Sequence, residues 1–221
     1  EESPIRVGPF GSDSGGVTIV LLLDRSNSMS AALPDVKRTA IEFVNLMYAG
    51  DSMAVATFGE DGRLEQNFTT DKDSLTAAIN AMTLEPYTAL YDGVLFGLEL
   101  LRDVPGYKAI VLLTAGRDRD SQADLQEAID SVAVAGIPVF GIGLGLKPDF
   151  GEPELQQITA ASNGSYYRSP TTTELAQIYQ TIFFRLYRFW YRISYTTGNC
   201  SPDDTLRTVR IDAKVGTQEC S

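Results

Sequence analysis

The sequence predicts a doubly wound, Rossmann-like α/β domain, in which a mostly parallel six-stranded sheet carries helices on both faces. Two observations predict it. Short apolar runs such as 17–23 alternate along the chain with segments whose apolar residues recur at helical spacing. These runs are continuous, which is typical of strands buried on both faces of a parallel sheet. Strands that alternate with helices favour crossover connections and hence parallel pairing.

Each predicted element is bounded by residues that end a strand or start a helix. The first strand, 17–23, stops at Asp24, and Pro34 can open the following helix because its ring fixes a helical backbone angle. Only a turn separates segments 52–58 and 64–68, so the second is predicted to be an antiparallel edge strand. The predicted strands are 17–23, 52–58, 64–68, 107–113, 137–144 and 165–167, and helices are predicted to begin near Pro34, Thr70, Ala89, Ser121, Glu152 and Thr173.

The two ends of the chain break this alternation. Residues 1–16 are rich in Gly, Ser and Pro and are predicted to be a linker with a short strand. Residues 188–221 contain two alternating strands with no helix between them, which predicts a β-hairpin extension that pairs with the N-terminal strand. The main domain is therefore predicted to span 17–187. Cys200 and Cys220 lie in the extension, and the sequence does not decide whether they form a disulfide or remain two free thiols.

Composition argues against several classes of function. The 221 residues carry a net charge of −11, with 29 acidic and 18 basic side chains. Phosphate groups repel such a surface, so nucleic acids and anionic membranes are poor partners. No apolar run is long enough for membrane insertion. The sequence has no His, which removes the commonest general base and the commonest zinc ligand, so we predict a binding module and not an enzyme.

The loop after the first strand carries the residues that point to a function. Asp24-Arg25-Ser26-Asn27-Ser28 places one carboxylate and two serine hydroxyls on a single turn. Ligands of open α/β sheets bind at the carboxyl ends of strands, where this turn lies. Hard cations such as Mg²⁺ take oxygen ligands in an octahedral array. The same residue types are common in turns and caps, so this motif alone does not decide between a cation site and a structural turn.

Two later loops favour the cation site. Residues 17–28 resemble the metal-ion-dependent adhesion site (MIDAS) of von Willebrand factor A-type domains, where a Thr from a later loop completes the site. Thr-Ala-Leu-Tyr-Asp at 88–92 is similar to the segment that carries this Thr, and Leu-Thr-Ala-Gly at 113–116 stands where the family has Leu-Thr-Asp-Gly. The resemblance covers about 17–186 and implies the strand order 3-2-1-4-5-6. It also implies a site for Mg²⁺, or for Mn²⁺ or Ca²⁺, formed by Asp24, Ser26, Ser28 and Thr88.

The chain departs from the family pattern in two places. Ala115 stands where the family has its last carboxylate, and the loss of that charge is expected to weaken cation binding by about 10–100-fold. Asp118 and Asp120 follow nearby, and we interpret both as solvated loop residues. Pro86 and Tyr87 replace the Gly-Gly that often precedes the Thr. Tyr87 is a candidate for ligand contact, and a ring packed within its loop is the alternative.

The resemblance implies an extracellular or cell-surface module for protein binding or adhesion. A cation held by few charges seeks an acidic group, so the expected partner is a protein that presents an acidic side chain. Asn27, between the two serines, is a further candidate for ligand contact. Residues 191–211 look like the tail of bacterial secreted proteins related to the same family. The alternative is a metal-independent scaffold or assembly module with a site silenced by Ala115, and a hydrolase that uses the cation to activate water ranks last.

Overall fold

The computed structural model describes residues 6–8, 16–145, 151–169, 171–188 and 192–194. Its main sheet is built from β2 (Thr18–Asp24), β3 (Ser52–Phe58), β4 (Gly62–Thr69), β5 (Lys108–Thr114), β6 (Val139–Leu144) and β7 (Ser165–Ser169). The strand order is β4-β3-β2-β5-β6-β7, and β4 pairs antiparallel at the edge while the other neighbours are parallel. Numbered along the sheet strands, this order is 3-2-1-4-5-6. The predicted fold class and strand order are therefore confirmed.

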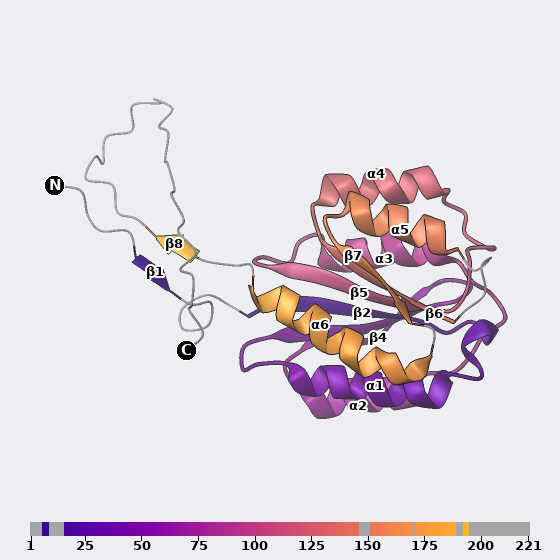
Figure 1. Ribbon diagram of the computed structural model, residues 1–221, viewed down its shortest axis with the longest axis horizontal. Coiled ribbons are helices and arrows are strands. Elements are labelled where there is room, and N and C mark those ends of the chain that lie inside the picture. The colour runs from indigo at the N-terminus through magenta and orange to yellow at the C-terminus, as the bar shows by residue number, and fades with distance from the viewer. Residues whose placement is uncertain (1–5, 9–15, 146–150, 170, 189–191, 195–221) are drawn as a thin grey trace, which may run out of the picture.

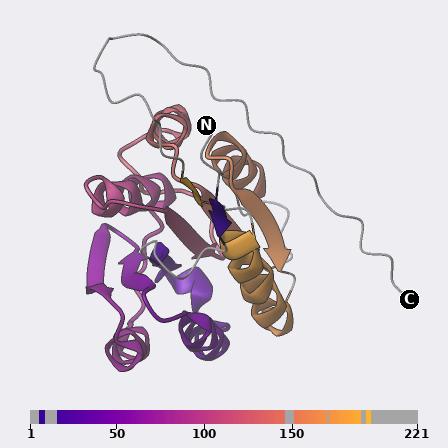
Figure 2. The ribbon, with the colours of Figure 1, turned by 90° about the vertical axis from the view of Figure 1, so that its left-hand side faces the viewer.

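Helices cover both faces of this sheet, as Figure 1 shows. One layer holds α1 (Leu33–Leu46), α2 (Lys72–Ala81) and α6 (Leu175–Arg188), and the other holds α3 (Leu90–Leu101), α4 (Leu125–Ala135) and α5 (Glu152–Ala161). The view of Figure 2, turned by 90°, shows the sheet between the two layers. Within the described part of the chain, no helix has the length and apolar character needed to cross a membrane.

The central strand β2 supplies side chains to both apolar cores. Ile19, Leu21 and Leu23 pack in the core beneath α1, α2 and α6. Val20 and Leu22 pack in the core beneath α3, α4 and α5. All five are buried, and each such side chain contributes roughly 1.5–3 kcal/mol relative to an exposed one. This burial on both sides explains the continuous apolar run and holds the end of β2 firmly at the centre of the sheet.

The ends of two helices differ from the sequence prediction. The α2 helix is capped by Asp71, whose carboxylate accepts a hydrogen bond from the Asp73 amide, and not by Thr70. The α4 helix is capped by Asp124, and Ser121 lies outside it. Aspartate is as good an N-cap as serine and better than threonine, so the nearer Asp takes each position. Gly136 ends α4 as predicted, with a left-handed φ of 62° that suits glycine.

Two short segments outside the main sheet form a second small sheet. β1 (Arg6–Gly8) pairs antiparallel with β8 (Arg192–Ser194), with Val7 opposite Ile193. The segment 206–215, predicted as the second strand of the extension, lies outside the described residues, and so do both cysteines. The division of the chain at residues 16 and 187 stays a prediction.

Candidate functional site

Asp24 is the last residue of β2, between β3 and β5, and its side chain is buried. One carboxylate oxygen accepts a hydrogen bond from the Ser26 amide at 2.7 Å. The other accepts from the Thr114 hydroxyl at 2.7 Å and from the Ala115 amide at 3.3 Å. Burial raises the pKa of Asp24, and the hydrogen bonds from Ser26, Thr114 and Ala115 oppose that rise. A neighbouring cation would therefore stabilise the ionised form of Asp24.

Two serine hydroxyls lie just beyond this carboxylate. Ser26 Oγ and Ser28 Oγ are 2.6 Å apart, because a short 3-10 helix over Asn27–Met29 folds the loop back on itself. Neighbouring ligands of an octahedral Mg²⁺, each about 2.1 Å from the ion, lie about 3.0 Å apart. The spacing of the two hydroxyls is close to that value. Ser26 is buried whereas Ser28 is exposed, so this side of the site opens to solvent.

Thr88 reaches the same place from the loop before α3. A Cβ atom built on Gly116 would lie 3.1 Å from Ser28 Oγ and 3.4 Å from Thr88 Oγ1. Gly116 therefore leaves a small space between the two hydroxyls that a larger residue would fill. Together with the contacts of Asp24, this brings the four predicted ligands to the carboxyl ends of β2 and β5.

The loop after β5 holds Thr88 through its main chain. The Thr88 amide donates to the Asp120 carboxylate at 2.8 Å, and the Tyr91 amide donates to the Asp118 carboxylate at 3.2 Å. Asp118 and Asp120 lie in this loop as predicted, Asp120 exposed and Asp118 partly buried, and each also accepts a main-chain hydrogen bond that the sequence did not reveal. Asp118 accepts from the first turn of α3, where negative charge is favourable, and Asp120 accepts from the loop just before it. One oxygen of each carboxylate thus holds the segment that carries Thr88 and begins α3.

The donor set fits a hard cation but carries little charge. Asp24 supplies one carboxylate, and the remaining candidate ligands are neutral hydroxyls. Among the described residues, no three His, Cys, Asp or Glu side chains gather in a group that could hold a metal ion. The Ala115 methyl group instead packs against the core. Mg²⁺, Mn²⁺ and Ca²⁺ accept hydroxyl and carboxylate oxygens, so the residues suit these ions, with a single negative charge to neutralise them.

The two candidates for ligand contact lie at the surface. Tyr87 keeps 42% of its surface exposed, so its ring is accessible beside Thr88. Asn27 is exposed between the two serines. Their roles stay predictions.

Three residues of the site have contacts that were not predicted from the sequence. Thr114 could have been found, because it follows an apolar run and ends the strand beside Asp24. Arg25 and Glu85 form a salt bridge across 60 positions of sequence, and neither has a local pattern that reveals the other.

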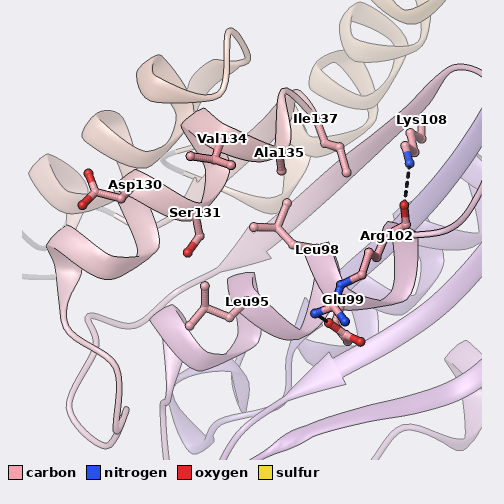
Figure 3. Close-up of a pocket in the computed structure, with 10 residues that line it drawn as sticks. All are labelled: Leu95, Leu98, Glu99, Arg102, Lys108, Asp130, Ser131, Val134, Ala135 and Ile137. Atoms are coloured by element: carbon pink, nitrogen blue, oxygen red, sulfur yellow. Dashed lines mark hydrogen bonds and ion pairs between the residues drawn. The ribbon is translucent and has the colours of Figure 1, made fainter.

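A pocket of about 630 Å³ lies between α3 and α4, far from these loops (Figure 3). Leu98, Val134 and Ile137 contribute apolar surface to it. Lys108, at its edge, donates a 2.7 Å hydrogen bond to the Leu101 carbonyl at the end of α3. Lys108 begins β5, whereas Asp24 ends β2, so the pocket lies toward the opposite end of the sheet. It contains none of the predicted site residues.

Comparison with known proteins supports the fold described above. The UPF0353 protein of Nocardia farcinica is 25% identical over 206 residues, covering 75% of this chain and 62% of the relative. A von Willebrand factor type A structure from Catenulispora acidiphila has a TM-score of 0.71 at 21% identity, covering 78% of this chain and 43% of that one. Proximal thread matrix protein 1 from the mussel byssus, solved with a zinc-occupied MIDAS motif, has a TM-score of 0.65 at 19% identity, covering 82% of this chain and 48% of that one.

The chain thus spans less than two thirds of each of these proteins. Residues 18–181 match the sequence pattern of the von Willebrand factor type A domain. This chain belongs to the von Willebrand factor type A domain family.

Proposed function

We infer that this domain binds an acidic group of a partner protein through a divalent cation. One observation carries the proposal. Three loops converge at the carboxyl ends of β2 and β5, and Gly116 leaves space between the hydroxyls of Ser28 and Thr88. The residues that would hold the cation are Asp24, Ser26, Ser28 and Thr88.

Charge balance supports an acidic partner. A divalent ion beside Asp24 alone keeps a net positive charge, and an Asp or Glu carboxylate of a partner would neutralise it. Mg²⁺, Mn²⁺ and Ca²⁺ all suit the oxygen donors. A zinc ion occupies the MIDAS motif of the mussel byssus protein, which supports a cation at the corresponding loops of this chain. That relative is a matrix protein, which supports an extracellular or cell-surface location for this domain.

The exposed side chains around the site suit a protein ligand. Ser28 and Asn27 are open to solvent, and Tyr87 presents an exposed aromatic ring on the loop of Thr88. Aromatic rings are common at the centres of protein interfaces because they bury much apolar area at low entropic cost. In this proposal Tyr87 packs against the partner while the cation binds its carboxylate. In this proposal the domain binds its partner and does not catalyse a reaction. Detectable turnover of a substrate would instead support the alternative of a cation-dependent hydrolase.

A peptide-binding assay tests this function. The probes are immobilised synthetic peptides with a central Asp or Glu, each with an Asn or Gln twin. We expect binding to the acidic peptides in Mg²⁺, loss of binding in chelator, and loss in Asp24→Asn. Asp130→Asn, an exposed carboxylate on α4, is the matched control and should bind as the wild type does. Equal binding to acidic and amide peptides would overturn the proposal.

Ala115 favours a second candidate function. With one carboxylate fewer than the family pattern, the domain could act as a metal-independent scaffold or assembly module. In that case a natural partner would stay bound in chelator, and Asp24→Asn would leave its affinity unchanged. The two functions therefore make opposite predictions for the same pair of measurements.

A further inference from the structure

Arg25 lies inside the loop of the candidate site, between Asp24 and Ser26, yet its side chain is only 1% exposed. Its guanidinium donates to Glu85 Oε1 at 2.5 Å and to Asp61 Oδ1 at 3.1 Å. A buried charge without a partner is strongly unfavourable, so these carboxylates are what keeps Arg25 inside. Glu85 is the stronger partner because its side chain is 26% exposed, whereas that of Asp61 is 75% exposed and screened by water.

The main chains of the same two residues are also joined. The Glu85 amide donates a 2.7 Å hydrogen bond to the Arg25 carbonyl, and Ser26 forms a parallel bridge with Glu85. Glu85 lies three positions before Thr88. The contact therefore links the loop that carries the carboxylate and the two serines to the loop that carries the threonine.

The ion pair sits on a third segment, the turn after β3. The Arg25 amide donates to the Phe58 carbonyl at 2.9 Å, and the Ala89 amide donates to the Gly59 carbonyl at 2.8 Å. A Cβ atom on Gly59 would lie 2.9 Å from Glu85 Oε2 and 3.2 Å from Arg25 Cγ. The pair is thus packed against the backbone of this turn. Arg63, whose side chain is 52% exposed, forms a longer ion pair of 3.6 Å with Glu85 Oε1, so Arg25 is the closer and more buried partner of Glu85.

We propose that the Arg25–Glu85 ion pair is a positioning pair for the cation site, which sets the place of Thr88 relative to Asp24 and Ser28. The proposal rests on the proposed function, because it concerns the same four ligands. The pair acts without contacting the cation, since the guanidinium is directed to Glu85 and Asp61. Without the pair, the loop of Thr88 loses the side-chain contact that fixes it against the loop of Asp24.

Mn²⁺ titrations followed by electron paramagnetic resonance test the pair in Glu85→Gln, Arg25→Met and the double variant. We expect each single change to weaken Mn²⁺ binding by about tenfold, as the loss of groups that orient metal ligands commonly does. The double variant should bind no more weakly than the worse single variant, because the two side chains act as one unit. If Arg25→Met does not fold, Glu85→Gln carries the test, since glutamine keeps the shape of glutamate.

A surface ion pair on α1 provides the matched control. Arg38 and Glu42 are 2.8 Å apart, with side chains 53% and 49% exposed. Arg38→Met and Glu42→Gln should leave Mn²⁺ binding unchanged. If Glu85→Gln lowers the free energy of unfolding but keeps Mn²⁺ affinity within about twofold of wild type, the pair is only structural and the proposal is overturned.

Amide hydrogen exchange separates this proposal from the proposed function. If the wild-type protein binds no Mn²⁺, the proposed function fails, and exchange then decides whether the pair fixes the two loops. We expect Glu85→Gln to speed exchange in residues 26–29 and in residues 86–89, and Glu42→Gln to leave both segments unchanged. Unchanged exchange in these segments of Glu85→Gln would overturn the positioning pair, whatever the cation titration gives.

Discussion

The hydroxyl of Thr114 donates a 2.7 Å hydrogen bond to the carboxylate of Asp24, and both side chains are buried. The bond joins the last residues of two neighbouring parallel strands, β5 and β2. A hydrogen bond to a charged group contributes roughly 1.5–3 kcal/mol to stability. Through it β5, which leads into Ala115 and Gly116, orients the carboxylate of Asp24.

Thr114→Val should lower the free energy of unfolding by about 1–3 kcal/mol, because valine keeps the shape but removes a donor from a buried carboxylate oxygen. Urea denaturation near neutral pH measures the change. Thr181→Val is the matched control, since Thr181 is exposed on α6 and donates only to the Gln177 carbonyl within its own helix. A loss at Thr114 no larger than that at Thr181 would contradict the role given to this bond.

The stability of the metal-free protein should depend on the protonation of Asp24. Burial raises the pKa of this carboxyl above its ordinary 3.8, so the folded state favours the protonated form. The stabilising contribution is therefore complete below the unfolded pKa and is lost as the pH rises through the folded pKa. In chelator, we expect the stability of Asp24→Asn relative to wild type to increase from about pH 4 upward until Asp24 is ionised.

Denaturation curves of both proteins across this pH range measure that difference. Other carboxyl groups are common to the two proteins and cancel, so the slope reports Asp24 alone. A difference that is constant with pH, or that falls as the pH rises, would show that Asp24 is not destabilised by its burial.

Ala115→Asp should tighten Mg²⁺ binding by about 10–100-fold, because it restores a second carboxylate to the site. Calorimetric titration measures the affinity. Ala115→Asn is the matched control, since it has the same shape without the charge and should not reproduce the gain. Equal affinities of wild type and Ala115→Asp would mean that the absence of a carboxylate at position 115 does not limit the affinity for Mg²⁺.

Gly116→Ala should weaken cation binding by about tenfold while changing the free energy of unfolding by less than about 1 kcal/mol. The added methyl group would lie 3.1 Å from Ser28 Oγ and 3.1 Å from the Thr88 methyl group, in the space between the two hydroxyls. Gly116 is not among the glycines with positive φ, so alanine fits its backbone. Unchanged affinity would mean that the space between Ser28 and Thr88 is not used by the ion.

The fold was predictable because its signals are local. Residues 17–23 form an unbroken apolar run, and the structure divides alternate side chains of that run between two cores. The hairpin of β3 and β4 follows from one short turn. The predicted helix starts near Thr70 and Ser121 differ from the structure because several nearby polar side chains can accept hydrogen bonds from the free amides of the first turn. The sequence does not show which of these side chains caps the helix.

The candidate site was only partly predictable. Ser26 and Ser28 follow Asp24 so closely that one turn places them together. The contacts that hold the loops in place are long-range, as between Asp120 and the amide of Thr88. No local pattern predicts that such a carboxylate accepts a hydrogen bond from an amide 32 positions away. The structure was needed to find the partners of Asp118 and Asp120.

A calorimetric titration of the wild-type domain and Asp24→Asn with Mg²⁺ and Mn²⁺ measures whether the domain holds a divalent cation at Asp24. Asp24 is the only carboxylate among the four proposed ligands, so the ion depends on it. We expect wild type to bind one ion, with an affinity that rises with pH as the proton leaves Asp24, and Asp24→Asn to show no binding. Absence of binding to wild type and to Ala115→Asp alike would contradict the cation-dependent function and favour the scaffold.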